Sequence, residues 1–414
     1  MTNEGTYVVE HSQASWQVLS EGSVTSPQGF KANGFHCGIK RKRPDLGWIH
    51  SEVPAHAAAV YTMNQFQAAP LRVTQESLAT EQKIQSVIVN SGVANACTGD
   101  EGLTNAYDMR QAFADHIGIP SHYAAVVSTG LIGEQLPMDQ ISAGIEQIKL
   151  DDDVSDNFER AIFTTDTRQK HVAVQTIIDG QQVTIGGAAK GSGMIHPNMA
   201  TMLGFVTTDA KIEHKELSEA LKTITNDTFN MITVDGDTST NDMVLVMANG
   251  LAGNETLSVT HQDWKRFVEA LTYVCQTLAQ MIARDGEGAT KLIEVKVDGA
   301  AHQEAAQAFS KAVVGSSLVK TAIYGTDPNW GRIVTAIGYG GYPLNPNQVH
   351  VALGPITVIE KGLPVPFDEQ EATAYLQQEN IQISVNLADG KGSAVAWGCD
   401  LTYDYVKINA SYRT

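Results

Sequence analysis

The segment KGSGMIHPNMATML, residues 190–203, lies at the middle of the chain and has three parts. Glycine and serine crowd its beginning, and Pro197-Asn198 follows as a turn signal. After the Ala200-Thr201 junction comes an apolar run, Met202 to Val206, which predicts a buried strand. Thr201 has two interpretations. A β-branched residue suits the start of a strand. If the chain breaks before it, however, Thr201 becomes a nucleophile whose own backbone nitrogen is the base.

The composition describes an ordinary globular protein and argues against polyanionic partners. Of 414 residues, 43% are hydrophobic and 18% are charged, which suits about two or three domains. The chain has 28 basic and 46 acidic side chains, so its formal net charge is −18. A nucleic acid or an acidic phospholipid surface would be repelled by such a chain. A locally basic pocket for a small acidic substrate is compatible with this charge.

Neither the cysteines nor the beginning of the chain indicates secretion. Cys37, Cys97, Cys275 and Cys399 are far apart and form no CxxC pair or zinc-type spacing. Residues 1–16 lack a basic segment followed by an apolar one, and no apolar run reaches the length of a membrane span. We therefore expect a reduced, cytoplasmic protein with no metal site.

Alternating helix and strand patterns predict an α/β or α+β layered fold. Buried strands are predicted at 87–89, 124–127, 205–207, 243–248 and 293–297, and amphipathic helices at 105–117, 138–148, 155–162, 214–229 and 263–283. The turn Asp179-Gly180 predicts a hairpin of 172–178 and 182–185, because Asp-Gly favours a tight two-residue turn.

The C-terminal part of the chain is predicted to return to strands, at 348–351, 381–387, 393–397 and 403–408. No internal repeat or clear linker interrupts the sequence. The composition does not change near residue 200, so a cleavage there would fall inside a folded body.

Three local patterns have structural interpretations. Residues 186–193 lack the spacing of a phosphate loop, since Ala189 rather than glycine precedes Lys190. Residues 235–246 lack the glycine and the glutamate that a calcium loop requires. His196 precedes a proline in a turn, and a histidine there is typically structural.

Three further features each keep two interpretations. Thr129-Gly130 follows a predicted strand, either as a strand cap or as an oxyanion hole whose donors face a developing negative charge. Glu287 lies between two glycines, either as a solvated loop carboxylate or as the partner of a substrate ammonium group. The chain end, 407–414, would usually fray and by itself supports no site.

In this order, the motifs resemble the ornithine acetyltransferase (glutamate N-acetyltransferase) family of the cyclic arginine pathway. The resemblance runs over nearly the whole chain, from Gly29 to Thr414, and rests on NSGVANACTG (90–99), STGLIG (128–133), TTDT (164–167), KGSGMIHPNMATML (190–203), RDGEGATK (284–291), GTDPNWGR (325–332) and INASYRT (408–414). The central motif is long and specific, so chance similarity explains it poorly.

The resemblance implies a fold and a processing step. The fold is an αββα sandwich of the N-terminal-nucleophile kind with a smaller C-terminal α/β domain. The precursor cuts itself between Ala200 and Thr201 into an α fragment, 1–200, and a β fragment, 201–414. Within the β fragment, 201–290 completes the core and about 291–414 forms the smaller domain. Two copies of each fragment would make an α2β2 assembly.

The resemblance also implies the roles of individual residues. Thr201 is the nucleophile, and Thr129 and Gly130 stabilise the oxyanion. Substrate contacts are expected from Thr164, Lys190, Thr201, Glu287, Asn409 and Thr414, although the TTDT motif leaves open which threonine makes the first of them. The acetyl group would pass from N-acetylornithine to glutamate through Thr201, with no bound cofactor. Whether acetyl-CoA is a second acetyl donor stays open.

Two other functions stay open on the sequence alone. An amidohydrolase or aminopeptidase would use the same N-terminal threonine with water as the acceptor. A metabolite-binding protein would keep residues 190–201 as a structural loop and remain one intact polypeptide.

Overall fold

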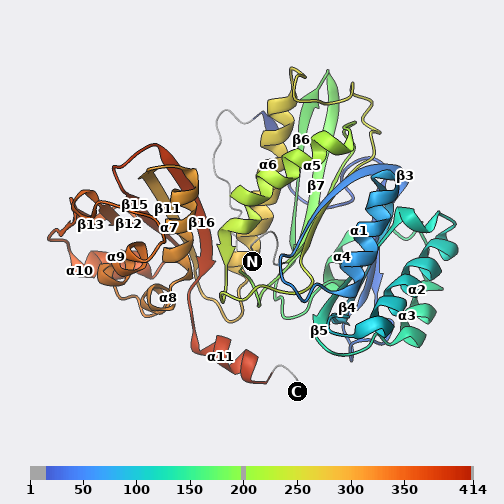
Figure 1. Cartoon of the computed structure of the whole chain (residues 1–414), viewed down its shortest axis with the longest axis horizontal. Coiled ribbons are helices and arrows are strands. Elements are labelled where there is room, and N and C mark those ends of the chain that lie inside the picture. Colours follow the sequence, from blue (N-terminus) through green and yellow to red (C-terminus); the bar gives the residue numbers. More distant parts are fainter. Residues whose placement is uncertain (1–14, 197–201, 412–414) are drawn as a thin grey trace.

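The structure is a computed structural model that describes residues 15–196 and 202–411. These residues build two β-sheets with helices packed against them. Figure 1 shows the nine-stranded sheet on the right, in blue to yellow, and the seven-stranded sheet on the left, in orange and red. The predicted mixed α/β class is confirmed.

The first sheet contains β1 (Trp16–Leu19), β2 (Phe30–Phe35), β3 (Leu46–Tyr61), β4 (Lys83–Val93), β5 (Ala124–Leu131), β6 (Lys170–Ile178), β7 (Gln181–Lys190), β8 (Leu203–Thr208) and β10 (Met243–Ala248). The accompanying helices are α1 (Ala69–Glu81), α2 (Gly99–Ile117), α3 (Met138–Ile145), α4 (Ser155–Ala161), α5 (His214–Asp227) and α6 (Trp264–Arg284). Short 3₁₀ turns lie at Ser121–Tyr123 and Phe229–Met231.

Strand β3 explains how one continuous sheet forms two layers. It is 16 residues long, and its register with β4 shifts between His50 and Ala55. Its first half pairs with β2, while its second half pairs with β10. A shift of this kind bends a strand and increases its twist. The strand order β1-β6-β7-β8-β10-β3-β4-β5 therefore folds back on itself at β3.

Side chains alternate between the inside and the outside of this folded sheet, as a strand requires. On β5, Val126 packs with residues of α2 and α3, while its neighbour Val127 points inward. On β8, Phe205 belongs to the same inner cluster as Val127, and Val206 packs with residues of α5 and α6. Four layers result: α2 and α3, β2 to β5, β6 to β8 with β10, and α5 with α6 (Figure 1). This is the expected αββα sandwich.

Helix α1 lies along the edge of β5. The Thr74 hydroxyl donates to the Val126 carbonyl at 2.7 Å and accepts from the Val126 N–H at 2.9 Å. These bonds satisfy the two backbone groups of Val126 on a strand at the end of the sheet, where a further strand could otherwise pair. They also fix the strand that carries Thr129 and Gly130 at its end.

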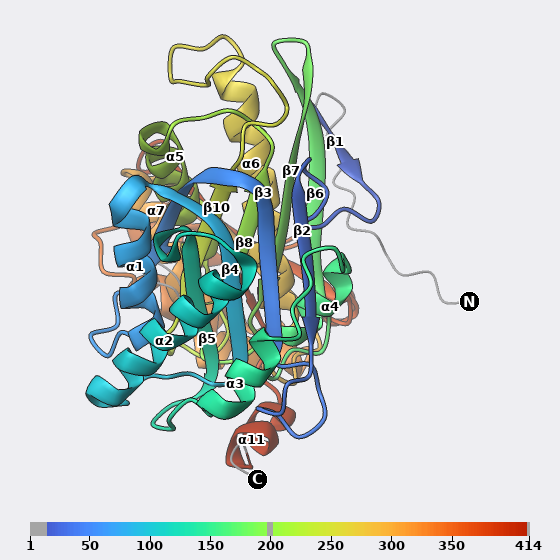
Figure 2. The ribbon, with the colours of Figure 1, turned by 90° about the vertical axis from the view of Figure 1, so that its right-hand side faces the viewer.

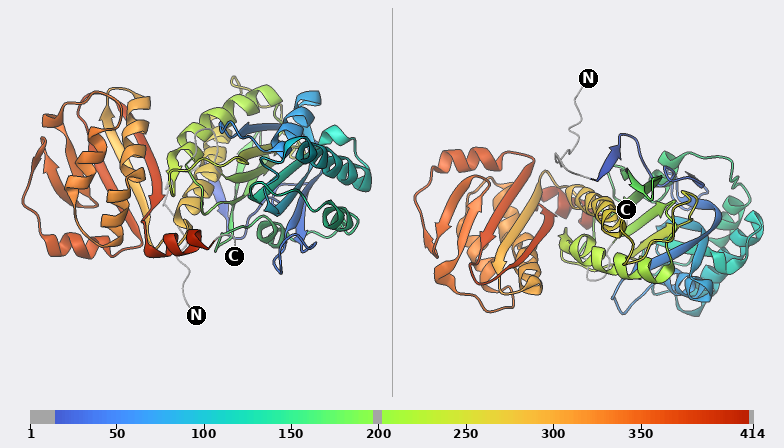
Figure 3. Two further views of the ribbon diagram at one scale, coloured as in Figure 1. Left: turned by 60° about the horizontal axis from the view of Figure 1, so that its bottom comes forward. Right: turned by 90° about the horizontal axis from the view of Figure 1, so that it is seen from above.

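The second sheet contains β9 (Ile232–Thr233), β11 (Leu292–Ala300), β12 (His350–Leu353), β13 (Ile356–Glu360), β14 (Leu363–Pro364), β15 (Asn380–Asn386) and β16 (Gly392–Cys399). Its helices are α7 (Gln303–Gly315), α8 (Ser317–Tyr324), α9 (Trp330–Gly338) and α10 (Glu369–Leu376), with a 3₁₀ turn at Pro346–Gln348. Strand β9 follows α5 in sequence and pairs with β16. This pairing ties the second sheet to the sandwich, and Figure 3 shows the two bodies side by side.

The glycine-rich run before Lys190 is not a turn. The hairpin was predicted to end at Ile185, but β7 continues to Lys190. A Cβ added to Gly187 would lie 2.8 Å from Cδ1 of Leu278 on α6. The small residues therefore allow a helix to approach the strand closely, a requirement that local sequence does not reveal.

The predicted strand at 403–408 is wrong. These residues belong to helix α11 (Tyr403–Ala410), because the Thr402 hydroxyl accepts the N–H of Tyr405 and caps the helix. Tyr403 is 76% exposed and Val406 is 63% exposed. The alternation of aromatic and β-branched residues favoured a strand, but this segment pairs with neither sheet.

Across residues 15–196 and 202–411, no helix combines the length and the apolar character needed to cross a bilayer. All four cysteines are free, and Cys275 and Cys399 are buried.

Candidate active site

One pocket of about 350 Å³ gathers most of the predicted site residues. Thr129, Gly130, Thr164, Lys190, Glu287 and Asn409 all line it. They come from the end of β5, the loop before β6, the end of β7, the loop after α6, and α11. The fold therefore brings together five segments that lie far apart in the sequence.

Three predicted residues, Ala200, Thr201 and Thr414, lie outside the described residues. The nearest described neighbour of the proposed cleavage point is Met202, which is buried just before β8. Its carbonyl accepts the N–H of Met243 at 2.9 Å. The chain thus enters the sheet beside β10.

Gly130 is required by the close packing of two strands. Strand β5 runs parallel to β4, with Thr129 opposite Ser91 and Gly130 opposite Gly92. Gly130 has a φ of +136°, and a Cβ there would lie 2.3 Å from the carbonyl carbon of Gly92. Only glycine fits this position. Thr129 and Gly130 both line the pocket, so the predicted oxyanion residues lie where a substrate could reach them.

Lys190 is a buried ammonium group held by hydroxyls. Its Nζ donates to Oγ1 of Thr164 at 2.8 Å and to Oγ1 of Thr129 at 3.3 Å. Asp166 lies 4.0 Å away. Burial lowers the pKa of Lys190, and the charge of Asp166 opposes this effect. Lys190 therefore contributes a buried cationic side chain to the wall of the pocket.

A buried ion cluster beneath Lys190 was missed in the sequence. Nζ of Lys170 lies 2.8 Å from Asp166 and 2.6 Å from Asp285, and Lys170 is only 1% exposed. Burial alone would raise the pKa of Asp166, but the charges of Lys170 and Lys190 hold it well below its usual range. The aspartates belong to the TTDT and RDGEG motifs, and no local pattern indicated that Lys170 joins them.

The TTDT threonines do different things. Thr164 and Thr165 line the pocket, and Thr164 is bonded to Lys190. Thr167 donates its hydroxyl and its N–H to Asp285 instead. The geometry thus favours Thr164 for the contact that the motif left open.

Glu287 is not a solvated loop carboxylate. It is 6% exposed, and its Oε2 accepts a hydrogen bond from Nδ2 of Asn409 at 2.7 Å. A Cβ added to Gly193 would lie 2.4 Å from Cδ of Glu287. The glycine loop and α11 therefore hold this carboxylate from two sides. Helix α11 supplies a site residue, although the chain end alone would not have justified one.

Asp242 belongs to the segment 235–246, which the sequence predicts to be structural and in which no site residue was expected. It directly precedes β10, as Met202 directly precedes β8, and Met243 pairs with Leu203. Its side chain is buried, and among the described residues its Oδ2 has no hydrogen-bond partner. Burial raises the pKa of Asp242 well above its usual range, although Ser239 and Lys190 act in the opposite direction. The carboxyl group beside the strand entry is therefore held toward its neutral form.

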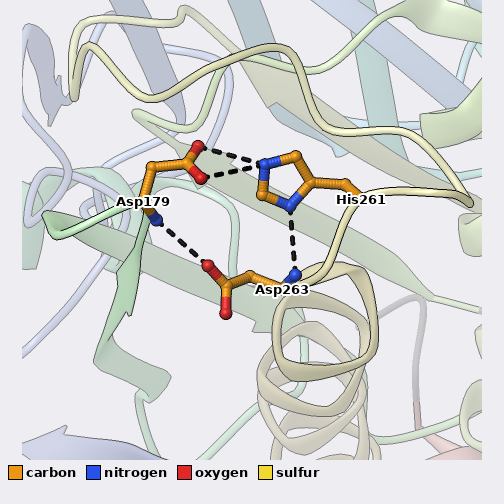
Figure 4. Close-up of side chains that lie close together, drawn as sticks. All are labelled: Asp179, His261 and Asp263. Atoms are coloured by element: carbon orange, nitrogen blue, oxygen red, sulfur yellow. Dashed lines mark hydrogen bonds and ion pairs between the residues drawn. The ribbon is translucent and has the colours of Figure 1, made fainter.

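One group of side chains in the described residues has the composition of a metal site: Asp179, His261 and Asp263 (Figure 4). Nδ1 of His261 accepts the N–H of Asp263 at 3.1 Å, so Nε2 carries the proton and donates to Asp179 at 3.0 Å. Asp263 in turn accepts the N–H of Asp179 at 3.1 Å. Both ring nitrogens are thus engaged. The group clamps the β6–β7 turn to the start of α6.

The sandwich and its pocket together define a class of protein. Thr129, Gly130, a buried lysine and a buried carboxylate line one pocket, a set of groups suited to acyl transfer on a small zwitterionic substrate. The comparison with protein families then places the chain within that class. A family model described as the ArgJ family matches residues 31–414, so the chain belongs to the ArgJ family.

Individual relatives agree with this assignment. The arginine biosynthesis bifunctional protein ArgJ of Halalkalibacterium halodurans is 61% identical over 399 residues, which are 96% of this chain and 97% of that protein. The protein of that name from Bacillus subtilis is 57% identical over 393 residues, which are 95% of this chain and 97% of its own. The predicted family and the predicted class, a bifunctional acetyltransferase of arginine biosynthesis, are confirmed.

A solved structure matches a smaller part of the chain. The crystal structure of the arginine biosynthesis bifunctional protein argJ from Bacillus halodurans is 61% identical, with a TM-score of 0.51. It covers 51% of this chain and 100% of the crystallised chain. That polypeptide is therefore about half as long as the present one.

Replacing Lys170 with Met should cost about 3–5 kcal/mol of unfolding free energy, because two buried carboxylates would lose their shared cation. Urea unfolding near neutral pH measures the loss. Lys265→Met is the matched control, since that side chain is 88% exposed and pairs with Glu269 on the helix surface. It should change the free energy by less than about 0.5 kcal/mol. Equal, small losses in both variants would contradict a structural role for the cluster.

Asp242→Asn should change how stability depends on pH. A raised pKa means that the folded state holds the proton, so the stability contributed by Asp242 is complete below its unfolded pKa and is lost as the pH rises through the folded pKa. As the pH rises through this range, the unfolding free energy of the natural protein should therefore fall relative to that of the variant by up to about 1.4 kcal/mol per pH unit. Urea unfolding between about pH 5 and pH 8 tests this. The exposed Asp152→Asn is the control, and parallel curves for Asp242→Asn would refute the expectation.

Proposed function

We propose that this chain moves the acetyl group of N2-acetyl-L-ornithine to L-glutamate through an acetyl ester of Thr201. The observation that carries the proposal is the single pocket where Thr129, Gly130, Lys190 and Glu287 meet. An amide carbonyl, an α-carboxylate and a side-chain ammonium group each find a complementary group there.

Self-cleavage would prepare the nucleophile. The Thr201 hydroxyl attacks the Ala200 carbonyl, and the chain to Ala200 shifts from nitrogen to oxygen. Hydrolysis of that ester leaves fragments 1–200 and 201–414 and a free amine on Thr201. An α-amine has a pKa of about 7.7–8.0, so part of it is neutral and can take a proton near neutral pH. The relative crystallised as a chain of about half this length supports such a division.

Acetyl transfer would then proceed in two half-reactions. The Thr201 oxygen attacks the acetyl carbonyl while the Thr201 amine takes its proton, and the developing oxyanion lies against Thr129 and Gly130. Loss of one such donor typically costs about 3 kcal/mol of transition-state stabilisation. Ornithine leaves with the proton, and glutamate attacks the acetyl ester in its place.

Substrate recognition follows from the charges in the pocket. Donor and acceptor both carry an α-carboxylate, so Lys190 serves each in turn. Glu287 pairs with the side-chain ammonium of ornithine, and Asn409 holds that carboxylate in place. Thr164 and Thr414 complete the contacts. We infer that this cytoplasmic enzyme needs no bound metal or cofactor, and that two α and two β fragments assemble as α2β2.

The acceptor distinguishes a transferase from a hydrolase built on the same nucleophile. Supplied with N-acetylornithine and glutamate, the protein should form N-acetylglutamate and ornithine in equal amounts. Without glutamate, release of acetate should be much slower than transfer. Chromatographic measurement of all four compounds tests this, and acetate release at one rate in both mixtures would show that water is the acceptor.

Thr201→Ala should leave the chain uncut and inactive, because it removes the oxygen on which both steps depend. Thr201→Ser should still cleave and retain part of the turnover, since its hydroxyl and amine survive. Denaturing electrophoresis with N-terminal sequencing follows cleavage, and the transfer assay follows activity. A cleaved and active Thr201→Ala variant would disprove the assignment.

A further inference from the structure

A run of four basic residues interrupts this acidic protein. Lys40, Arg41, Lys42 and Arg43 are consecutive, in a chain whose net charge is −18. They line a surface hollow of about 340 Å³. Figure 2 shows the connection between β2 and β3, to which they belong, in blue below the sandwich. The function proposed above does not use them.

The loop that carries the run is built around one buried carboxylate. Asp45 is fully buried and accepts the backbone N–H groups of Cys37 at 2.6 Å and Lys40 at 2.8 Å. It also bonds Nδ1 of His36 at 2.9 Å. This carboxylate thereby fixes the backbone from which the basic side chains project.

The basic side chains are not neutralised by carboxylates. Within residues 15–196 and 202–411, no ion pair involves any of the four. Nζ of Lys40 donates to the carbonyls of Pro44 and Phe163 instead. Burial lowers the pKa of Lys40 to about 8, and the charge of Arg43 acts in the same direction. The charges of Asp45 and Asp166 act on Lys40 in the opposite direction. The exposed side chains of Arg41 and Lys42 therefore supply the positive charge of the hollow that is open to a ligand.

This hollow adjoins the active-site pocket. Nη2 of Arg43 donates to the carbonyl of Thr164 at 2.9 Å, and Thr164 lines the pocket. A Cβ added to Gly92 would lie 3.2 Å from Cγ of Lys40. Gly92 pairs directly with Gly130, so the basic loop lies one strand away from the proposed oxyanion donor.

We propose that residues 40–43 bind the phosphate groups of a coenzyme A thioester whose acetyl group reaches the pocket at Thr129 and Gly130. The pocket of about 350 Å³ suits an amino acid. The nucleotide part of acetyl-CoA then has to lie outside it, where the adjoining hollow offers clustered charge. Arginine and lysine together suit phosphate oxygens. The assignment rests on the proposed function, since the acetyl group is to be received by Thr201.

The chemistry needs no further reactant. The Thr201 oxygen attacks the thioester carbonyl, a C–O bond forms, and the C–S bond breaks. The hydroxyl proton passes through the Thr201 amine to the thiolate, so coenzyme A leaves as a free thiol. The acetyl ester is the one that N-acetylornithine would also form, and glutamate accepts the group from either donor.

Other anions fit the hollow less well. A nucleic acid or an anionic membrane would meet the excess of 46 acidic over 28 basic side chains elsewhere on the chain. The carboxylates of glutamate and N-acetylornithine are small enough to bind at Lys190 inside the pocket. A phosphate-bearing acyl donor uses both the hollow and the pocket.

Arg41→Glu/Lys42→Glu tests the site, because both side chains are exposed and the substitutions should not disturb the fold. Three acetyl donors are compared, each with glutamate: acetyl-CoA, the phosphate-free thioester S-acetyl-N-acetylcysteamine, and N-acetylornithine. The KM for acetyl-CoA should rise about tenfold or more. The kinetic constants for the other two donors should stay within about twofold, since neither carries a phosphate.

Lys215→Glu/Lys222→Glu on α5 makes the same change in charge and should leave the kinetic constants for all three donors unaffected.

Isothermal titration of the natural protein with coenzyme A, dephospho-coenzyme A and inorganic phosphate should give successively weaker binding. Unchanged acetyl-CoA kinetics in the Arg41/Lys42 variant would overturn the site while transfer from N-acetylornithine continued. Four other results would also overturn the site. Two concern binding: inorganic phosphate binds as tightly as coenzyme A, or a DNA oligonucleotide binds more tightly than coenzyme A. Two concern kinetics: the variant raises only the KM of glutamate, or the natural protein fails to use acetyl-CoA. If the natural protein showed no acetyl transfer from N-acetylornithine to glutamate, the proposed function itself would be refuted.

Discussion

The active-site pocket depends on a buried charge balance. Lys170 forms ion pairs with both Asp166 and Asp285. Lys190, which lies 4.0 Å from Asp166, is therefore not the only cation that neutralises these two buried carboxylates. Asp166 also accepts the N–H of Gly191 at 2.7 Å, so the same carboxylate fixes the backbone directly after Lys190. A buried charge that lacks a partner is costly. The cluster therefore orders the pocket floor around Lys190.

The remaining parts of the pocket are held by similar long-range contacts. Glu287 is bonded to α11, which follows the last strand of the second sheet, while Thr129 and Gly130 end a strand in the opposite half of the sandwich. Neither body has a complete pocket without the other. The pairing of β9 with β16 is consequently part of the site, because it sets where α11 begins.

The sequence predicted the local features well and the long-range ones poorly. The hairpin at Asp179-Gly180 and the helix α6 follow from turn chemistry and periodicity, which depend on neighbouring residues. Motifs identified six residues that the fold places in one pocket. The bend of β3, the close approach of α6 to Gly187 and the partnership of Lys170 with Asp285 each depend on residues far apart in the chain. The helix at 403–410 was missed because its decisive signal is a single cap, Thr402.

The arrangement of positive charge separates two recognition tasks. Lys190 is buried, so it is suited to one carboxylate inside the pocket. Lys40 is half-buried, while Arg41, Lys42 and Arg43 are exposed, and together these four residues suit a ligand with several charges. The negative charge on the rest of the protein repels an extended polyanion such as a nucleic acid. A compact polyanion contacts only the clustered cations, because more distant charges are screened by salt. The shared link is Thr164, whose hydroxyl bonds Lys190 and whose carbonyl bonds Arg43. Thr164 thus connects the buried Lys190 to the basic loop of residues 40–43.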